Sequence, residues 1–286
     1  MHRSEAPTGI VAAIPARYGS TRLPAKPLAR LAGRPLVEHV YERAAAAPAV
    51  DRVVVLTDDE RVGRAVEAFG GAWEMTPGDF ASGTDRIAWA ARGWDCRAVV
   101  NVQGDWILDP ALIGALAGHL AGHPQEAMAT LAVPARAAEE DEPSVVKVVC
   151  DLTGCALYFS RAAIPFRRHP GGPPTLRHLG IYGYRRETLL KLAALPPSPL
   201  ERAESLEQLR ALENGIPIRV LVVEGEARGV DTAEDLERAE AALRGPTGRP
   251  ARGPAATAGG PPALRPAVAS TRSWEEERLC RPSTSS

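Results

Sequence analysis

The chain has 286 residues, of which 45% are hydrophobic, and its 34 basic residues are balanced by 35 acidic ones. A chain of this length forms one large domain or two small ones. Its near-neutral charge argues against a nucleic-acid partner, because proteins that bind nucleic acids usually carry an excess of basic residues. Because no apolar stretch is long enough for a membrane span or a signal peptide, we expect a cytoplasmic protein without a membrane partner.

The first half of the chain alternates short β-rich runs with helical patterns. The apolar residues of the runs are nearly continuous, which is typical of strands covered on both faces of a parallel sheet. Prolines and acidic residues begin the helical patterns, and glycines end several of them. Strands are expected at residues 9–16, 52–57 and 97–103, and helices at residues 35–47, 58–70 and 110–122. This order predicts an α/β fold.

The pattern becomes richer in β-strands after residue 127. Strands are expected at residues 128–135, 145–151, 155–165, 176–186 and 216–224, and helices at residues 199–215 and 231–245. Because no helix separates residues 151 and 155, the two strands around them predict a hairpin. Cys150 and Cys155 flank its turn, and we expect reduced thiols there, with a disulfide as the alternative. The α/β fold therefore carries a β-rich insertion.

The two ends of the chain differ in composition from the region between them. We expect a flexible N-terminus at residues 1–8 and one domain at residues 9–244. Residues 245–286 are rich in Pro, Gly, Ala and Ser and contain few large apolar groups. Such a segment buries too little surface to offset its ordering entropy, so it is predicted to be a disordered tail.

Three cations gather on the loop that follows the first predicted strand. Arg17, Arg22 and Lys26 lie there beside Gly19 and Ser20, small residues that let backbone N–H groups approach phosphate oxygens. Ligands of open α/β sheets bind outside the carboxyl ends of the strands, so this loop predicts a triphosphate site. The Walker and G-x-G-x-x-G patterns are absent. A solvated basic loop is the alternative.

Two aspartates follow later predicted strands. Asp105 comes after residues 97–103 and Asp231 after residues 216–224, at the edge where ligands bind. Mg²⁺ takes one or two carboxylates together with substrate phosphates, so the pair is a candidate metal site; helix capping is the alternative for each. Ser82 and Gly83 open a further helix, where backbone groups and Arg86 are candidates for reading a base edge.

The remaining polar candidates have no informative spacing. A lone histidine in a strand is usually structural, and a Glu-Gln pair on an amphipathic helix usually lies on the surface. These candidates are Arg161, His178, Tyr182, Glu207 and Gln208.

Together, ten strings resemble the 3-deoxy-manno-octulosonate (Kdo) cytidylyltransferases, in family order across about residues 9–243. The resemblance implies a nucleotide-diphospho-sugar-transferase-like (Rossmann-like) fold, with a mostly parallel sheet, helices on both faces and a β-rich dimerisation insertion. It also implies transfer of CMP from CTP to a sugar acid, with Mg²⁺ as cofactor and a homodimer as the assembly. The strings are IPARYGSTRLPAKPL, TDDERVGRAVEAFGG, SGTDR, NVQGD, ATLAVP, VKVV, ALYFSRAAIP, RHLGIYGY, PSPLERAESLEQLRALENG and GVDTAEDLERA.

The resemblance also assigns roles to individual residues. It places Arg17 and Lys26 on the triphosphate, assisted by Ser20 and Arg22, and it makes Asp105 and Asp231 the metal ligands. Ser82, Gly83 and Arg86 match the cytosine side. The sugar-acid side is matched by Gln103, Arg161, His178, Tyr182, Glu207 and Gln208.

Two departures from the family pattern concern the acceptor. The family usually has an acidic residue and a proline after Asp105, where this chain has Trp106 and Ile107, and the segment at residues 166–176 is short. Transfer to Kdo is therefore weighed against transfer to another acid, such as an amino-Kdo, another ulosonate or a phosphonate. The missing acidic residue raises a further alternative, a catalytically weak nucleotide-binding protein. A glycosyltransferase is disfavoured because the chain lacks a D-x-D motif on the right strand.

Overall fold

The computed structural model describes residues 9–19, 23–169, 172–224, 227–230 and 232–244. The predicted flexible N-terminus (residues 1–8) and disordered tail (residues 245–286) lie outside this part of the chain, as do the candidate site residues Ser20, Arg22 and Asp231.

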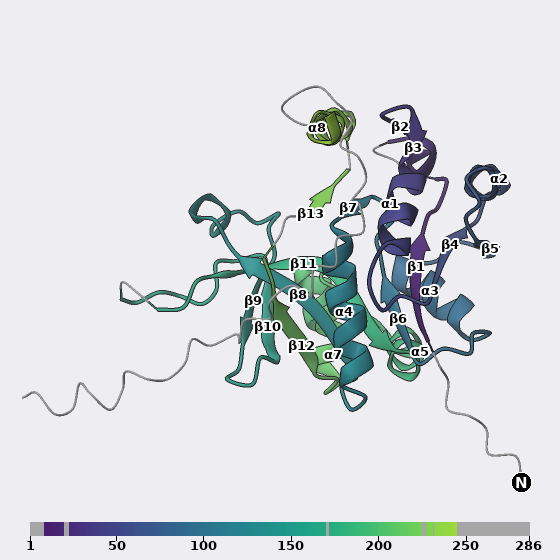
Figure 1. Ribbon diagram of the computed structural model, residues 1–286. Helices are drawn as coiled ribbons and strands as arrows, with labels where there is room; N and C mark the ends of the chain where they lie inside the picture. Colours follow the sequence, from purple (N-terminus) through teal and green to yellow (C-terminus); the bar gives the residue numbers. More distant parts are fainter. Residues whose placement is uncertain (1–8, 20–22, 170–171, 225–226, 231, 245–286) are drawn as a thin grey trace, which may run out of the picture.

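A mixed nine-stranded sheet forms the centre of the molecule (Figure 1). Its parallel part comes from the first half of the chain: β1 (Ile10–Pro15) lies between β4 (Arg52–Thr57) and β6 (Ala98–Asn101), and β5 (Trp73–Met75) extends the order beyond β4. The strand β11 (Leu176–Arg185) runs antiparallel to β6 and joins this part to the second half of the chain. The predicted α/β fold is confirmed.

Helices cover both faces of the sheet, as the side chains of β1 demonstrate. Ile10, Ala12 and Ile14 pack into one hydrophobic cluster, whereas Val11 and Ala13 pack into another on the opposite face. This alternation is the two-residue period of a strand buried on both sides. The first face is covered by α1 (Leu36–Ala45), α2 (Glu60–Ala68) and α4 (Pro110–Gly122), and the second by α3 (Gly83–Ala91), α5 (Arg186–Ala194) and α7 (Gln208–Glu213). Among the described helices, none has the length and apolarity needed to cross a bilayer.

The second half of the chain builds the predicted β-rich insertion. β9 (Lys147–Cys150) and β10 (Ala156–Ser160) form the expected antiparallel hairpin, and β8 (Met128–Pro134) pairs with both β11 and the parallel strand β12 (Ile218–Val222). Cys150 and Cys155 are free thiols beside the hairpin turn, which agrees with the expected reduced state.

Several short elements were not predicted because two or three residues are too few to show a period. Their pairing depends on long-range contacts instead; β7 and β13, for example, are joined across more than one hundred residues. They are β2 (Arg30–Leu31), β3 (Arg34–Pro35), β5, β7 (Trp106–Leu108), β13 (Ala227–Gly229) and the 3₁₀ helices η1 (Lys26–Leu28) and η2 (Ala137–Glu139). The nine-residue helix α5 was also not predicted. The last helix, α8 (Ala233–Arg244), packs near β2.

The single helix predicted at residues 199–215 is wrong. The structure has α6 (Pro199–Glu204) and α7, separated at Ser205, whose φ of 52° is left-handed. Tertiary contacts hold the break: the Glu204 carboxylate accepts hydrogen bonds from Ser160 Oγ at 2.6 Å and from the Arg161 N–H at 3.0 Å. Because the chain turns here, residues that a continuous helix would expose can point inward.

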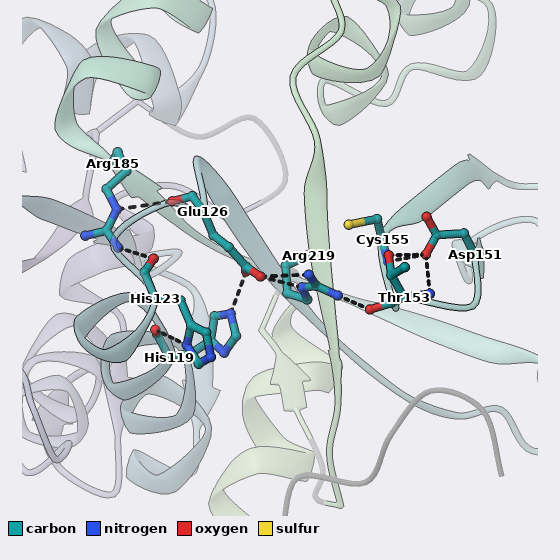
Figure 2. A network of polar contacts seen from close by, with 8 residues as sticks. All are labelled: His119, His123, Glu126, Asp151, Thr153, Cys155, Arg185 and Arg219. Carbon is teal, nitrogen blue, oxygen red and sulfur yellow. Dashed lines mark hydrogen bonds and ion pairs between the residues drawn. The ribbon is translucent and has the colours of Figure 1, made fainter. Parts of the chain in front are cut away.

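A polar network ties the C-terminal end of α4 to the insertion (Figure 2). The Glu126 carboxylate lies 2.6 Å from His119 Nε2 and accepts a hydrogen bond from Arg219 Nε at 2.8 Å. Arg219 on β12 in turn donates to the Thr153 carbonyl in the β9–β10 turn. The network therefore links the end of α4 to β12 and to the β9–β10 turn.

Candidate functional site

A cavity of ≈ 260 Å³ opens at the carboxyl ends of β1 and β6. This is the edge at which the sequence predicted a ligand site, and the strand ends, the loop after β1 and the N-terminus of α3 all contribute to its wall. The cavity is lined by seven of the predicted site residues, Arg17, Lys26, Ser82, Gly83, Arg86, Gln103 and Asp105.

Lys26 and Asp105 form an ion pair on the wall of this cavity. Lys26 Nζ donates to Asp105 Oδ2 at 2.5 Å, and their side chains are 12% and 31% exposed. The alternative interpretation of Asp105 as a helix cap does not hold, because Asp109 caps α4 by accepting a hydrogen bond from the Ala111 N–H. Asp105 therefore directs its charge to a cation at the cavity wall.

Two glycines allow the chain segments around the cavity to approach closely. A Cβ on Gly104 would lie 2.6 Å from the carbonyl oxygen of Pro15, closer than real side chains come, and a Cβ on Gly83 would lie 3.0 Å from Pro15 Cγ. The turn at residues 103–105 therefore depends on glycine for its packing against β1. This packing sets the position of Asp105.

Replacing Gly104 with alanine should displace this turn together with Asp105, and kcat/KM of any reaction at this cavity should fall about tenfold or more, because small misplacements of a positioned group are costly. Steady-state kinetics would check this. The matched control is Gly118→Ala in the exposed face of α4, where nothing lies within 4 Å of the added Cβ. It should leave kinetics unchanged and raise stability slightly, by about 0.5–1 kcal/mol. Equal kinetics for the two variants would contradict the role of Gly104.

Arg86 forms part of the wall through a buried guanidinium. Its Nη2 donates to Asp58 Oδ2 at 3.0 Å, its Nη1 donates to Thr76 Oγ1, and its side chain is 5% exposed. The alternative of a surface arginine is therefore wrong. Ser82 caps α3, accepting a hydrogen bond from the Asp85 N–H at 3.1 Å while still lining the cavity.

A second polar cluster borders the cavity: the Glu207 carboxylate interacts with Tyr182, Thr84 and Ser82, and Ser82 lines the cavity. Gln208 follows Glu207 directly in the chain. Among the described residues, Tyr182 Oη, Glu207 Oε1 and Gln208 Nε2 are buried without a hydrogen-bond partner. Burial raises the pKa of Glu207 and of Tyr182. Buried polar atoms without partners are costly, so their presence in one cluster indicates a binding site for a polar ligand. The expectation of a surface Glu-Gln pair fails because the turn at Ser205 directs both residues inward.

Asn101 lies between Gln103 in the cavity and Thr84, which hydrogen-bonds to Glu207 of the cluster, and sequence analysis missed it. Its Oδ1 accepts a hydrogen bond from Gln103 Nε2 at 3.1 Å, and its Nδ2 lies 3.4 Å from Thr84 Oγ1. Both Thr84 and Asn101 also interact with the Tyr184 hydroxyl. A buried asparagine inside a valine-rich strand, in the string AVVN, was the signal available in the sequence.

His178 lies in the same region but has a neutral, structural environment. Its Nε2 is 3.0 Å from Thr130 Oγ1, and its ring packs edge-on against Phe159. Burial lowers the pKa of His178 to about 3.

The burial of His178 predicts a specific loss of stability in acid. In the unfolded chain its pKa is about 6.5, so between pH 6.5 and 3 the unfolded state binds more protons and the free energy of unfolding falls as the pH falls. The loss at pH 5 is about 2 kcal/mol. Urea unfolding at pH 7 and pH 5 should show a shallower pH dependence for His178→Asn than for the wild type. The same dependence in both proteins would contradict this assignment.

Arg161 and Trp106 do not line the cavity. Arg161 Nε donates to the Glu204 carbonyl at 2.8 Å and its Nη1 to the Pro143 carbonyl at 3.1 Å. The Trp106 indole packs over two glycines: a Cβ on Gly229 would lie 3.4 Å from Trp106 Nε1, and one on Gly180 would lie 3.9 Å from Cζ2. The role predicted for Arg161 therefore stays a prediction.

Arg17, Lys26 and Arg86 give this cavity, at the ends of parallel strands, the position and charge typical of a site for a phosphate-bearing ligand in an α/β protein. A family model described as cytidylyltransferase matches residues 11–220, which makes the protein a nucleotidyltransferase. The chain is 50% identical over 247 residues to a 3-deoxy-manno-octulosonate cytidylyltransferase from Syntrophotalea carbinolica, with 82% of this chain and 99% of that protein covered. An enzyme of the same name from Myxococcus xanthus is 52% identical over 237 residues, with 82% and 96% covered.

A solved structure agrees with these relatives. A CMP:2-keto-3-deoxy-manno-octonic acid synthetase in complex with CTP superimposes with a TM-score of 0.79 at 45% identity, covering 82% of this chain and 97% of that one. The chain belongs to the 3-deoxy-manno-octulosonate cytidylyltransferase family, which confirms the resemblance found in the sequence.

Proposed function

We propose that the protein transfers CMP from CTP to the anomeric hydroxyl of Kdo and releases pyrophosphate. The observation that carries this proposal is the cavity that joins Arg17, Lys26 and Asp105 on one wall to Ser82, Gly83 and Arg86 on the other. The names of the relatives and the CTP complex of the structural neighbour support both substrates.

The reaction needs positioning and charge stabilisation more than covalent chemistry. The sugar hydroxyl attacks the α-phosphorus in line while pyrophosphate leaves. Arg17 and Lys26 bind the triphosphate and neutralise the charge that builds on the α-phosphate and the leaving group, with Ser20 and Arg22 assisting from the same loop. The N-terminus of α3, at Ser82 and Gly83, holds the cytosine side with Arg86.

Mg²⁺ is the cofactor that this site suits. In the described ranges, no three His, Cys, Asp or Glu side chains gather closely enough to hold a metal ion, so the substrate phosphates would supply the other oxygen ligands. Asp105 and Asp231 are the proposed protein ligands; the residue before Asp231 donates its N–H to the Asp105 carbonyl at 2.8 Å, which supports their pairing. When bound, the ion would supply positive charge beside the phosphates and lower the pKa of the attacking hydroxyl.

Pyrophosphate release tests the proposal most simply. With Mg²⁺ and Kdo, the purified protein should release pyrophosphate from CTP but not from UTP or ATP. Turnover with UTP alone would overturn the assignment of the base.

The identity of the acceptor needs a separate experiment, in which several acids are offered as acceptors with CTP. Trp106 and the short segment at residues 166–176 depart from the family pattern and are the reason for testing acids other than Kdo. An amino-Kdo, other ulosonates and a phosphonate should react more slowly than Kdo. If Kdo is inert while another acid reacts, the proposed acceptor is wrong. If CTP binds but no acid reacts, the protein is a nucleotide-binding homologue without activity.

The buried cluster is the proposed sugar-acid site, formed by Gln103, Tyr182, Glu207 and Gln208, with His178 behind it. Arg161 is proposed to meet the carboxylate of the acid, as a guanidinium suits that group. The unpartnered atoms Tyr182 Oη, Glu207 Oε1 and Gln208 Nε2 support this use, since hydroxyl groups of a sugar would satisfy them.

Replacing Glu207 with glutamine should weaken the binding of the sugar acid while it stabilises the folded protein. The change should raise KM for the acid about tenfold by altering the hydrogen bonding of a buried group, with a smaller change in KM for CTP, because Glu207 also hydrogen-bonds to Thr84 and Ser82. It should also raise stability at pH 7, because the pKa of Glu207 is raised by burial and its ionisation costs folding energy above the unfolded pKa. Denaturant unfolding at pH 7 and pH 4 should show the gain only at pH 7. A wild-type KM for the acid would remove Glu207 from the site.

A homodimer through the insertion is the proposed assembly. Leu157 on β10 is 62% exposed, and Leu152 and Phe166 are 84% and 89% exposed, which leaves apolar surface on this part of the chain. Sedimentation should give the mass of a dimer. A monomer at all concentrations would contradict it. Free cysteines fit a reducing compartment, so we place the protein in the cytoplasm.

A further inference from the structure

We infer that Asp58 is a positioning residue that sets the distance between the two walls of the CTP cavity. This inference rests on the proposed function, and it concerns a residue that does not line the cavity. Asp58 lies directly after β4, between the loop that follows β1 and the start of α2.

The two carboxylate oxygens of Asp58 bind two different segments of the cavity lining, the loop after β1 and the helix α3. Oδ1 accepts a hydrogen bond from the Tyr18 N–H at 3.1 Å, and Oδ2 accepts one from Arg86 Nη2 at 3.0 Å. Tyr18 follows Arg17 in the phosphate-side loop, whereas Arg86 belongs to α3 on the cytosine side. One side chain therefore cross-links the two parts of the site that must hold a single nucleotide.

The contacts on the far side of Arg86 make this cross-link rigid. Arg86 Nη1 donates to Thr76 Oγ1, and Thr76 Oγ1 donates to the Thr57 carbonyl at 3.1 Å. Thr57 and Asp58 are neighbours, so the guanidinium is fixed between two points on the end of β4. Because Arg86 is 5% exposed, its charge needs the Asp58 carboxylate nearby.

Loss of this cross-link should weaken the binding of CTP and leave the binding of the sugar acid unchanged. Loss of Asp58 frees the peptide between Arg17 and Tyr18 and leaves the buried Arg86 charge uncompensated. Both changes occur in the segments proposed to bind CTP. The unpartnered atoms proposed to bind the sugar acid belong to other residues, Tyr182, Glu207 and Gln208.

The test compares Asp58→Ala and Asp58→Asn with a control ion pair. Asp58→Ala should raise KM for CTP about tenfold and the calorimetric Kd for CTP alone by a similar factor, with KM for Kdo within about twofold. Asp58→Asn should lie between Asp58→Ala and the wild type, because the amide keeps one acceptor oxygen while its NH₂ group cannot accept from the other partner. The control is Glu126→Ala, which removes the carboxylate that pairs with Arg219 in the remote network of Figure 2.

The control variant should lose thermal stability without any change in either KM. In addition, Asp58→Ala should have a smaller effect on CTP binding in an Arg86→Ala background, because the two residues act through one contact. A KM and Kd for CTP within twofold of the wild type in Asp58→Ala, or equal effects of Asp58→Ala and Glu126→Ala, would overturn the inference.

The Kd measurement keeps this inference distinct from the proposed function. If the wild type binds CTP but transfers nothing to Kdo, the proposed acceptor fails while the effect of Asp58 is still measured. If the wild type does not bind CTP, both fail.

Discussion

Replacing Asp105 with asparagine should abolish turnover, with a fall in kcat of about 10³-fold or more. Asparagine preserves the shape of the side chain but removes its charge, so Lys26 loses its carboxylate partner and the proposed Mg²⁺ loses a ligand. Pyrophosphate release measured over a range of Mg²⁺ concentrations would check this. A partial rescue at high Mg²⁺ would fit a weakened metal site.

The matched control is Asp109→Asn, four residues further along. Asp109 caps α4 through the Ala111 N–H at 2.9 Å, and asparagine caps helices equally well. This variant should retain wild-type activity and stability. If Asp105→Asn is as active as Asp109→Asn, Asp105 does not hold the metal and the proposed mechanism fails.

Replacing Lys147 with methionine should destabilise the fold strongly, by about 3–5 kcal/mol. Lys147 is 0% exposed, and its ammonium donates to the carbonyl oxygens of Glu142, Val145 and Arg161 at 2.9, 2.7 and 2.6 Å. Burial lowers its pKa, but three acceptors satisfy its three donors. Methionine fills a similar volume and leaves all three carbonyls without the ammonium donor.

Denaturant unfolding would measure this loss, with Lys191→Met as the control. Lys191 is exposed near the end of α5, so its replacement should change stability by less than about 0.5 kcal/mol. If Lys147→Met unfolds at the same denaturant concentration as the control, the three hydrogen bonds do not hold the insertion together.

Much of the fold could be predicted because its strands and helices carry local signals. The predicted bounds of α4 match the structure, since Asp109, Pro110 and Gly122 mark its start and end. The break at Ser205 could not be predicted, because it depends on contacts between Glu204 and β10, which are distant in sequence.

The candidate site likewise contains features that could be predicted from the sequence and features that could not. The shared location of Arg17, Lys26 and Asp105 could be predicted, because strand ends in a parallel sheet meet at one edge. Asp58, Asn101 and the buried ammonium group of Lys147 act through tertiary hydrogen bonds, which leave no period or spacing in the sequence. The turn at Ser205 then determines that Glu207 and Gln208 face inward.

The most direct test of the central claim is a crystal structure of the protein with CTP and Mg²⁺. We expect the triphosphate within hydrogen-bond reach of Arg17 and Lys26, and a metal ion on the oxygens of Asp105 and Asp231. A nucleotide bound elsewhere, or phosphates with Lys26 directed away from them, would contradict the account.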